Sequence, residues 1–209
     1  MLARPILGAN GMRIGATTAL LGAMMDQQNN DKTGECQKCA ENWTMVIFNL
    51  LFIGPCIFSM VSPLTVSSKG RFKTIFDTFG LVTLHSMMYS FMHRVMHKIV
   101  AFRPIHKKHH TYIDDVRPSN ANAVSSSEFL LAYMLPFVTG CYVLRPSLCS
   151  LSCASMVVSI FNLLVHSKFV EFNLPWFFVT SEEHLQHHKS KSAMYSAPTF
   201  SWEKILRFS

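Results

Sequence analysis

Charged side chains are scarce in this sequence: they make up 15% of its 209 residues, against about 25% in an ordinary soluble domain. Apolar residues make up 49%, which excludes a disordered chain because such chains have low hydrophobicity. Cysteine is also sparse, with six residues, and a disulfide-stapled secreted module needs dense cysteine in a short chain. The Cys36–Cys39 pair has no second pair downstream, so a four-ligand zinc site is not predicted.

The sequence also lacks the patterns of β-structure and of repeat proteins. No segment alternates apolar and polar residues with a period of two, and no repeat of 20 to 50 residues occurs. The net charge is +7, but the lysines and arginines flank apolar runs and form no continuous basic stripe. That distribution is typical of a membrane surface and does not indicate a nucleic-acid partner.

Four apolar runs account for most of the hydrophobic content. Residues 43–64 contain no charged side chain and are long enough to cross a hydrocarbon core of about 30 Å. A turn at Arg145-Pro146 separates the last two runs, which therefore resemble a transmembrane hairpin, and Pro136 and Gly140 should kink its first arm. The predicted fold is an all-α integral membrane protein with about four spans, at residues 43–64, 75–92, 129–144 and 148–165. Residues 1–42 are interpreted as a poorly defined N-terminal head, and residues 43–209 as the membrane-embedded domain.

Histidine is absent from the first 84 residues, yet the chain contains ten. His93 and His97 form an H-x-x-x-H pattern, which places two rings on one face of a helix where they can reach one metal ion. Alone, this pattern is weak, because it arises often by chance. A second pattern, H-x-x-H-H at His106, His109 and His110, should project three rings from one helical face.

The H-x-x-H-H pattern occurs a second time, beyond the predicted hairpin, at His184, His187 and His188. A repeat of this triple pattern by chance is very improbable. His166 ends the fourth span and emerges on the same side as the other clusters if the hairpin enters and returns. His85 lies inside an apolar run, and its pattern leaves open a metal-related role or a buried partnership with Asp77 or Tyr89.

These patterns predict a site for two metal ions at one membrane face, because nine imidazoles are too many for one ion. Imidazole suits iron, zinc, copper and nickel alike. Two adjacent redox metals in a membrane-embedded site suit oxygen activation, and iron is the usual choice for cleaving an unactivated C–H bond. Zinc is redox-inert and does not suit this chemistry. The second ring N–H of each ligand needs an acceptor, for which the candidates are Asp114, Asp115, Glu182 and Glu183. The predicted ligands are His93, His97, His106, His109, His110, His166, His184, His187 and His188, with His85 as a possible addition.

The order of these histidine boxes around a membrane hairpin resembles the fatty acid hydroxylase and sterol desaturase superfamily over about residues 72–206. Residues 93–97 are similar to its HRxxH box, 105–110 to IHKxHH, and 127–136 to the acidic start of its hairpin. Residues 166–176 resemble the HSGYxxPW segment of sterol-acting members, and 197–206 the APxFxxWDKIL ending of cholesterol 25-hydroxylase-like and sphingoid-base hydroxylases. The chain departs from the family pattern at Ser86, Ser90-Phe91 and Ser125-Ser126, and the closing Phe-Gly-Thr is missing.

The resemblance implies a membrane-bound diiron enzyme that uses O2 and electrons from cytochrome b5 or an NAD(P)H-linked reductase. Its histidines would be ligands rather than general bases, and the reaction would be hydroxylation or desaturation of a sterol, sphingoid or fatty acyl lipid. The implied location is the endoplasmic reticulum membrane, with several spans and the metal site facing the cytosol. The basic residues near the histidines agree with that orientation, whereas Lys69, Arg71 and Lys73 would then lie on the lumenal side.

Two other classes of function remain open from the sequence. A non-catalytic metal-binding scaffold, a degenerate member of the family, is the main alternative. A histidine-lined metal transporter ranks third, because a transporter should carry its ligands within the spans, and here nearly all lie at span ends.

Overall fold

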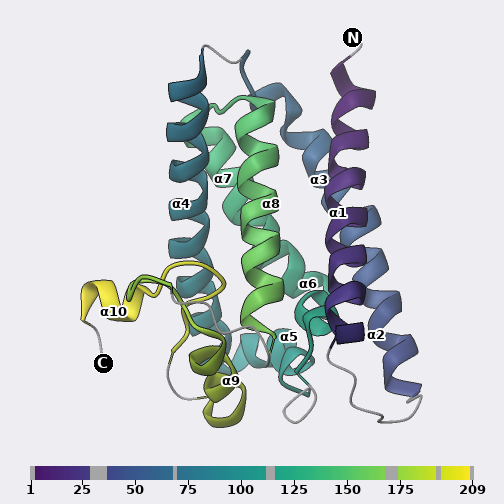
Figure 1. Ribbon diagram of the computed structural model, residues 1–209, viewed down its shortest axis with the longest axis vertical. Coiled ribbons are helices and arrows are strands. Elements are labelled where there is room, and N and C mark those ends of the chain that lie inside the picture. Colours follow the sequence, from purple (N-terminus) through teal and green to yellow (C-terminus); the bar gives the residue numbers. More distant parts are fainter. Residues whose placement is uncertain are drawn as a thin grey trace.

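The computed structural model describes residues 3–28, 37–67, 70–111, 116–167, 174–191 and 194–207. Within these ranges the regular structure is entirely helical, apart from two isolated β-bridges. The longest helices run side by side along the long axis of the molecule (Figure 1). The fold is therefore all-α, as the sequence predicts. The helices of this bundle are α1 (Ala3–Gln28), α2 (Gln37–Phe48), α3 (Gly54–Val61), α4 (Arg71–Lys98), α7 (Leu135–Leu144) and α8 (Leu148–Val165).

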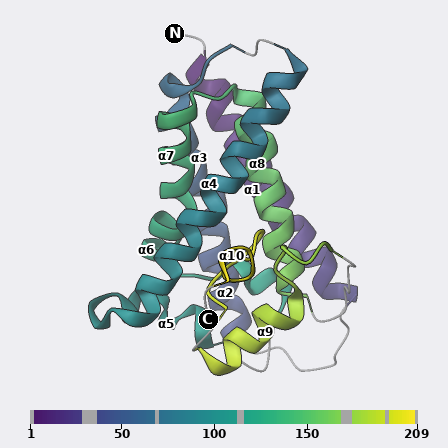
Figure 2. The same ribbon diagram turned by 90° about the vertical axis from the view of Figure 1, so that its left-hand side faces the viewer.

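The short elements gather at one end of this bundle, where α4 and α8 end (Figures 1 and 2). This end contains the histidine boxes. The elements concerned are η3 (Val100–Phe102), α5 (Arg103–Lys107), η4 (His109–Thr111), η5 (Pro118–Asn122), α6 (Ser126–Glu128), α9 (Ser181–Ser190) and α10 (Trp202–Leu206).

Three helical segments are long and apolar enough to cross a membrane: Asn42–Leu64, Ser126–Leu144 and Leu148–Val165. They match three of the four predicted spans. The fourth predicted span, residues 75–92, lies within α4, which is not among the segments that meet this standard. In the described part of the chain, length and composition alone thus select three segments, against about four predicted spans.

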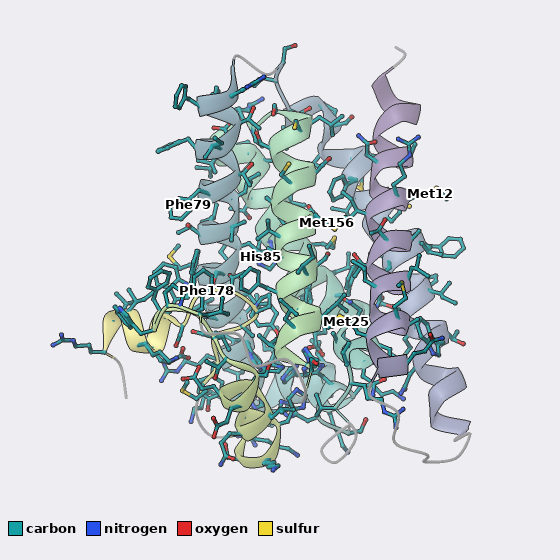
Figure 3. All side chains as sticks on the ribbon, viewed as in Figure 1. Met12, Met25, Phe79, His85, Met156 and Phe178 are labelled. Carbon is teal, nitrogen blue, oxygen red and sulfur yellow. The ribbon has the colours of Figure 1, made fainter. Side chains whose placement is uncertain are left out.

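The average hydropathy of α4 is low because the helix carries charged residues near both ends and buried polar side chains along one face. Asp77, His85 and Ser86 are buried, whereas Phe72, Phe76, Phe79 and Phe91 are 61–91% exposed. Figure 3 shows Phe79 on the outer edge of α4 and His85 on the side that faces α8. This arrangement reverses that of a soluble amphipathic helix, and it suits a helix with lipid outside and a polar site inside.

The basic residues that disagreed with the expected orientation lie at the far end of α4. Arg71 begins the helix and His97 lies in its last turn, so about 40 Å separates them at 1.5 Å per residue. Lys73 forms an ion pair of 2.6 Å with the buried Asp77. One of the cations remote from the histidines is therefore paired within the helix.

Each of two prolines in the apolar segments follows a stretch of π-helix. The π-helix η1 (Asn49–Ile53) precedes Pro55, and η6 (Phe129–Met134) precedes Pro136. Proline has no N–H to donate, and the wider turn re-routes the hydrogen bonds around it. The sequence predicts a kink at Pro136, and the irregularity takes the form of this π-helical turn.

Helix α1 belongs to the bundle, although the sequence indicates no defined structure for residues 1–42. It packs against α3, η1 and α8. Gly15 makes the approach to η1 possible: a Cβ atom at this position would lie 2.0 Å from the carbonyl oxygen of Leu50. Cys36 lies outside the described residues, as do Lys69, Asp114, Asp115 and Lys168.

A buried connection between the histidine boxes is held by asparagine side chains from the bundle. Residues 118–124 are buried and include η5. Asn49 donates to the carbonyl oxygens of Asn122 (3.2 Å) and Val124 (3.0 Å), and Asn162 of α8 donates to that of Ala121 (3.3 Å). These bonds satisfy carbonyl oxygens at the end of η5 and just beyond it, which otherwise have no partner away from water. They also fix the second histidine box relative to α8.

The contact between α1 and η1 predicts a difference between two glycines of one helix. Gly15→Ala should destabilise the protein by about 1–3 kcal/mol, the usual cost of overpacking, because the obstacle is backbone. Gly22→Ala is the matched control, since its Cβ would have its nearest neighbours at 3.4 Å and alanine favours the helix. Thermal unfolding in detergent micelles measures both. Equal melting temperatures for the two variants would contradict the packing of α1 described above.

Candidate metal centre

The nine histidines that the sequence predicts as ligands lie in two groups. The ring nitrogens of each group lie within 4.8 Å of one another. All of these side chains are buried except that of His97, which is partly buried. The five-histidine group contains His93, His97, His106, His110 and His187, and the four-histidine group contains His109, His166, His184 and His188.

The two H-x-x-H-H boxes cross between the groups. His106 and His110, four residues apart, join the five-histidine group, whereas His109 joins the other. The third box does the reverse: His184 and His188 join the four-histidine group, and His187 joins the five-histidine group.

Within each box the i, i+4 pair joins one group and the residue at i+3 joins the other. Positions i, i+3 and i+4 of a helix lie on one face, so rings that project from a single face of α9 reach both groups. The second box is divided between α5 and η4. Each box thus ties the two groups together.

The ring nitrogens within each group converge. Nε2 atoms lie 2.9 Å apart for His93 and His106, 3.1 Å apart for His97 and His187, and 3.1 Å apart for His166 and His184. Nδ1–H of both His93 and His106 donates elsewhere, so the Nε2 lone pairs of these two rings face and repel each other. A cation between them removes this repulsion, and the donor set therefore fits a metal ion.

Three of the rings are oriented by acceptors for their second nitrogen. Nδ1–H of His93 donates to the carbonyl oxygen of Tyr195, that of His166 to the carbonyl oxygen of Asn162, and that of His106 to the carboxylate of Glu128, each at 2.7 Å. Such bonds fix the tautomer and aim Nε2 at the centre. Glu128 is completely buried, so its bond to His106 is shielded from competing water.

The acids predicted for this role are not the ones found. Asp114 and Asp115 lie outside the described residues, and Glu182 is exposed. Glu183 accepts from the backbone N–H of Thr180 in a capping box and pairs with Lys204 at 2.5 Å. The available signal was Glu128 itself, an acid at the start of an apolar span, where an unpaired charge is expensive.

The C-terminal segment holds the first histidine box from outside. Ser86 Oγ accepts from the indole N–H of Trp202 at 3.1 Å and the backbone N–H of Phe200 at 3.2 Å. Glu203 accepts from the backbone N–H of Tyr195 at 2.8 Å, the residue whose carbonyl orients His93. Ser86, a departure from the family pattern, thus anchors the segment that orients a ligand.

Two further departures also have structural roles. Ser90 donates to Ser196 Oγ at 3.1 Å, which adds a second link to the C-terminal segment. Ser125 accepts from the backbone N–H of Glu128 at 3.1 Å and donates to the carbonyl oxygen of Ile105 at 2.8 Å. Ser125 therefore connects the start of the hairpin to the second histidine box.

His85 belongs to neither group of histidines. It is fully buried, with its ring 4.6 Å from that of Phe137 and 6.2 Å from that of Tyr89, measured between centroids. Asp77, one of its two suggested partners, is paired with Lys73 instead. The stack with Tyr89 agrees with the interpretation of His85 as a buried neighbour of that residue.

Burial keeps the histidines neutral, which is the form that binds metal. Burial, followed by repulsion from His187 and His97, lowers the pKa of His110 from 6.5 to about 3. Burial, followed by repulsion from His166, lowers the pKa of His188 to about 2. The pKa of His106 is also lowered well below 6.5, chiefly by burial. At neutral pH these imidazoles therefore offer free lone pairs.

The helical bundle with apolar spans and two groups of histidines at one end defines a class: membrane-type proteins with a histidine-rich candidate metal centre. A family model for fatty acid hydroxylases matches residues 78–207. The chain belongs to this family, whose members are in general oxidative, lipid-modifying enzymes, and the resemblance inferred from the histidine boxes is confirmed. Searches of curated proteins and of solved structures find no match.

The bond between His106 and Glu128 predicts an effect on metal affinity. Glu128→Ala should weaken binding by about 10- to 100-fold, the usual cost of losing such a partner, because the Nδ1–H of His106 would lose its acceptor. Glu128→Gln keeps an acceptor and should lose less. Glu182→Gln, at an exposed acid of α9, is the control. Titration of the metal-free protein against a chelator of known affinity measures all three, and equal affinity for Glu128→Ala and the control would refute this role.

The lowered histidine pKa values predict a pH dependence for the metal-free protein. In the unfolded chain histidine takes up a proton near pH 6.5, whereas folded His110 and His188 do so only near pH 3 and 2. Between these values the unfolded chain binds more protons, so stability is greatest above pH 6.5 and falls as the pH is lowered. Each such histidine contributes up to about 1.4 kcal/mol per pH unit. The melting temperature should fall between pH 7.5 and 5.5, less steeply in His110→Gln; a constant value would exclude neutral burial.

Proposed function

We propose that the protein is a membrane-bound diiron lipid oxidoreductase that uses O2 to hydroxylate, or to desaturate, a sterol, sphingoid or fatty acyl substrate. The observation that carries the proposal is the division of nine histidines, eight of them buried, into two adjacent groups at one end of an apolar bundle. A single metal needs no more than one of these groups. Two redox ions held together next to lipid are suited to the chemistry of the family.

The metal ligands in this proposal are the five-histidine and the four-histidine groups, and no further catalytic residue is assigned. When bound, two iron ions would supply the activation of O2 and the cleavage of an unactivated C–H bond. The chain's own residues hold and orient: Glu128 and the carbonyl oxygens of Tyr195 and Asn162 fix three rings. These three rings are almost completely buried. Their burial keeps bulk water from them, which protects reactive species from side reactions.

Electrons would come from a cytochrome b5-type donor or an NAD(P)H-linked reductase, on the cytosolic face of the endoplasmic reticulum membrane. The charge distribution supports this orientation. Several cations lie near the histidine boxes, and cytoplasmic segments of membrane proteins are enriched in such residues. They are Arg94, Lys98, Arg103, Lys107, Lys108, Lys189 and Lys191.

The geometry weighs against the metal transporter. In the described part of the chain both groups of histidines lie at the same end of the bundle, and His85 alone lies deep within a helix. A transport path needs polar groups along its length. The non-catalytic scaffold has the same geometry as the enzyme, so only an assay for an oxidised product distinguishes them.

The proposal predicts two metal ions per chain and an oxidised lipid that depends on both. Protein loaded with Fe²⁺ in nanodiscs is supplied with NADPH, cytochrome b5 and its reductase, and with cholesterol, sphinganine or palmitate. Mass spectrometry under ¹⁸O2 should detect a labelled alcohol, or an alkene without label, from one of the three lipids.

Paired substitutions provide the controls for this experiment. His93→Ala with His97→Ala removes two ligands of one group, and His184→Ala with His188→Ala removes two of the other. Each pair should lower the iron content from two ions to about one and abolish the product. Protein that keeps two irons and forms no product from any of the lipids would refute the enzyme and support a scaffold.

A further inference from the structure

A large cavity opens onto the five-histidine group from the outer end of the bundle. Its volume is about 810 Å³, and His97, His106 and His110 form part of its wall. This is within the usual range of about 300–1,000 Å³ for ligand sites. The cavity inside the bundle, bordered by α1, α3, α7 and α8, measures only about 50 Å³, too little for a lipid. Size therefore selects the outer cavity as the place where a substrate approaches the metal centre.

One side of this cavity is apolar. Met96, Val100 and Pro104 line it. Val100 and its neighbour Ile99 are exposed, at 71% and 47%. Exposed apolar side chains at a cavity mark a route for an apolar ligand. An alkyl chain can thus pass over Ile99 and Val100 into the cavity.

The other side of the cavity is positively charged. Arg103, Lys107 and Lys191 line it and are exposed. In the residues that the structure describes, no carboxylate forms an ion pair with any of the three. Arg103 is fixed by a bond of 3.1 Å from its Nε–H to the carbonyl oxygen of His97. Three cations facing one cavity without an acid are complementary to an anion.

From these observations we infer that the cavity binds an amphiphile with an anionic headgroup, with the headgroup at Lys107 and Lys191 and the alkyl chain along Met96, Val100 and Pro104. This inference rests on the proposed function and narrows its substrate class. A long-chain carboxylate or a long-chain acyl ester of a phosphate fits both walls. A sphingoid base carries a positive charge and is repelled by the rim, and a sterol offers nothing for the cations to bind.

Equilibrium binding, which does not depend on turnover, tests the inference. Metal-loaded protein in nanodiscs of neutral phosphatidylcholine is titrated with radiolabelled palmitate, hexadecanol and sphinganine, which share a long alkyl chain and differ in charge. Palmitate should bind at least about tenfold more tightly than hexadecanol, as expected for hydrogen bonds to a charged group. A parallel titration with palmitoyl-coenzyme A distinguishes the two anions, because tighter binding than palmitate assigns the rim to phosphate and weaker binding assigns it to carboxylate.

Lys107→Gln combined with Lys191→Gln should remove the advantage of palmitate over hexadecanol. Lys189→Gln is the matched control, because Lys189 is an exposed lysine of α9 that does not line the cavity. Unchanged iron content and melting temperature show that the double variant is folded. Equal affinities for palmitate and hexadecanol would overturn the inference, as would a preference that survives the double substitution. A double variant that binds palmitate normally and only loses reduction by cytochrome b5 would also overturn it, in favour of a docking surface for the donor.

Failure of this inference can be distinguished from failure of the proposed function. Oxidation of a neutral lipid without a preference for anions refutes the headgroup site and leaves the enzyme intact. A preference for palmitate that depends on Lys107 and Lys191, without any oxidised product, supports the headgroup site and refutes the enzyme.

Discussion

Everything at the working end of this protein depends on the convergence of imidazole lone pairs in a place almost without water. Neutral His93 and His106, whose Nδ1–H groups donate elsewhere and whose Nε2 atoms lie 2.9 Å apart, repel each other unless a cation lies between them. Burial makes the arrangement possible, because it holds the pKa values of the histidines far below neutrality. The same burial makes it unstable without a metal ion. The fold has to supply enough packing and hydrogen bonding to hold such a site in place.

That support comes from parts of the chain that are remote in sequence. Asparagine side chains of the bundle fix the buried connection at residues 118–124, and the backbone of Asn162 orients His166 at the same time. The C-terminal segment bonds to Ser86 and orients His93 through the carbonyl of Tyr195. Each group of histidines is therefore assembled from several helices and loops. The crossing of the two H-x-x-H-H boxes adds a direct link, since a displacement of either box affects both groups.

The membrane-facing surface follows from the same requirement. Helix α4 carries Asp77, His85 and His93 on its inner face and phenylalanines on its outer face. A mean over the whole helix combines these two faces, and for this reason hydropathy alone selects three spans and omits α4. For a helix that lines a polar site, the relevant quantity is the hydropathy of its exposed face. On α4 that face carries Phe72, Phe76, Phe79 and Phe91, which suits contact with lipid.

The sequence by itself determined the all-α class, three apolar spans, the family and the nine histidines that come together. It could do so because each is a local pattern: an uninterrupted apolar run, or ring spacings of three and four residues. Only the tertiary structure decided which histidine joins which group, that α1 packs into the bundle, and that Glu128 and Tyr195 support the ligands. Those facts depend on distances between segments up to about a hundred residues apart, such as His93 and Tyr195. No spacing along the chain encodes such distances, because packing between helices sets them.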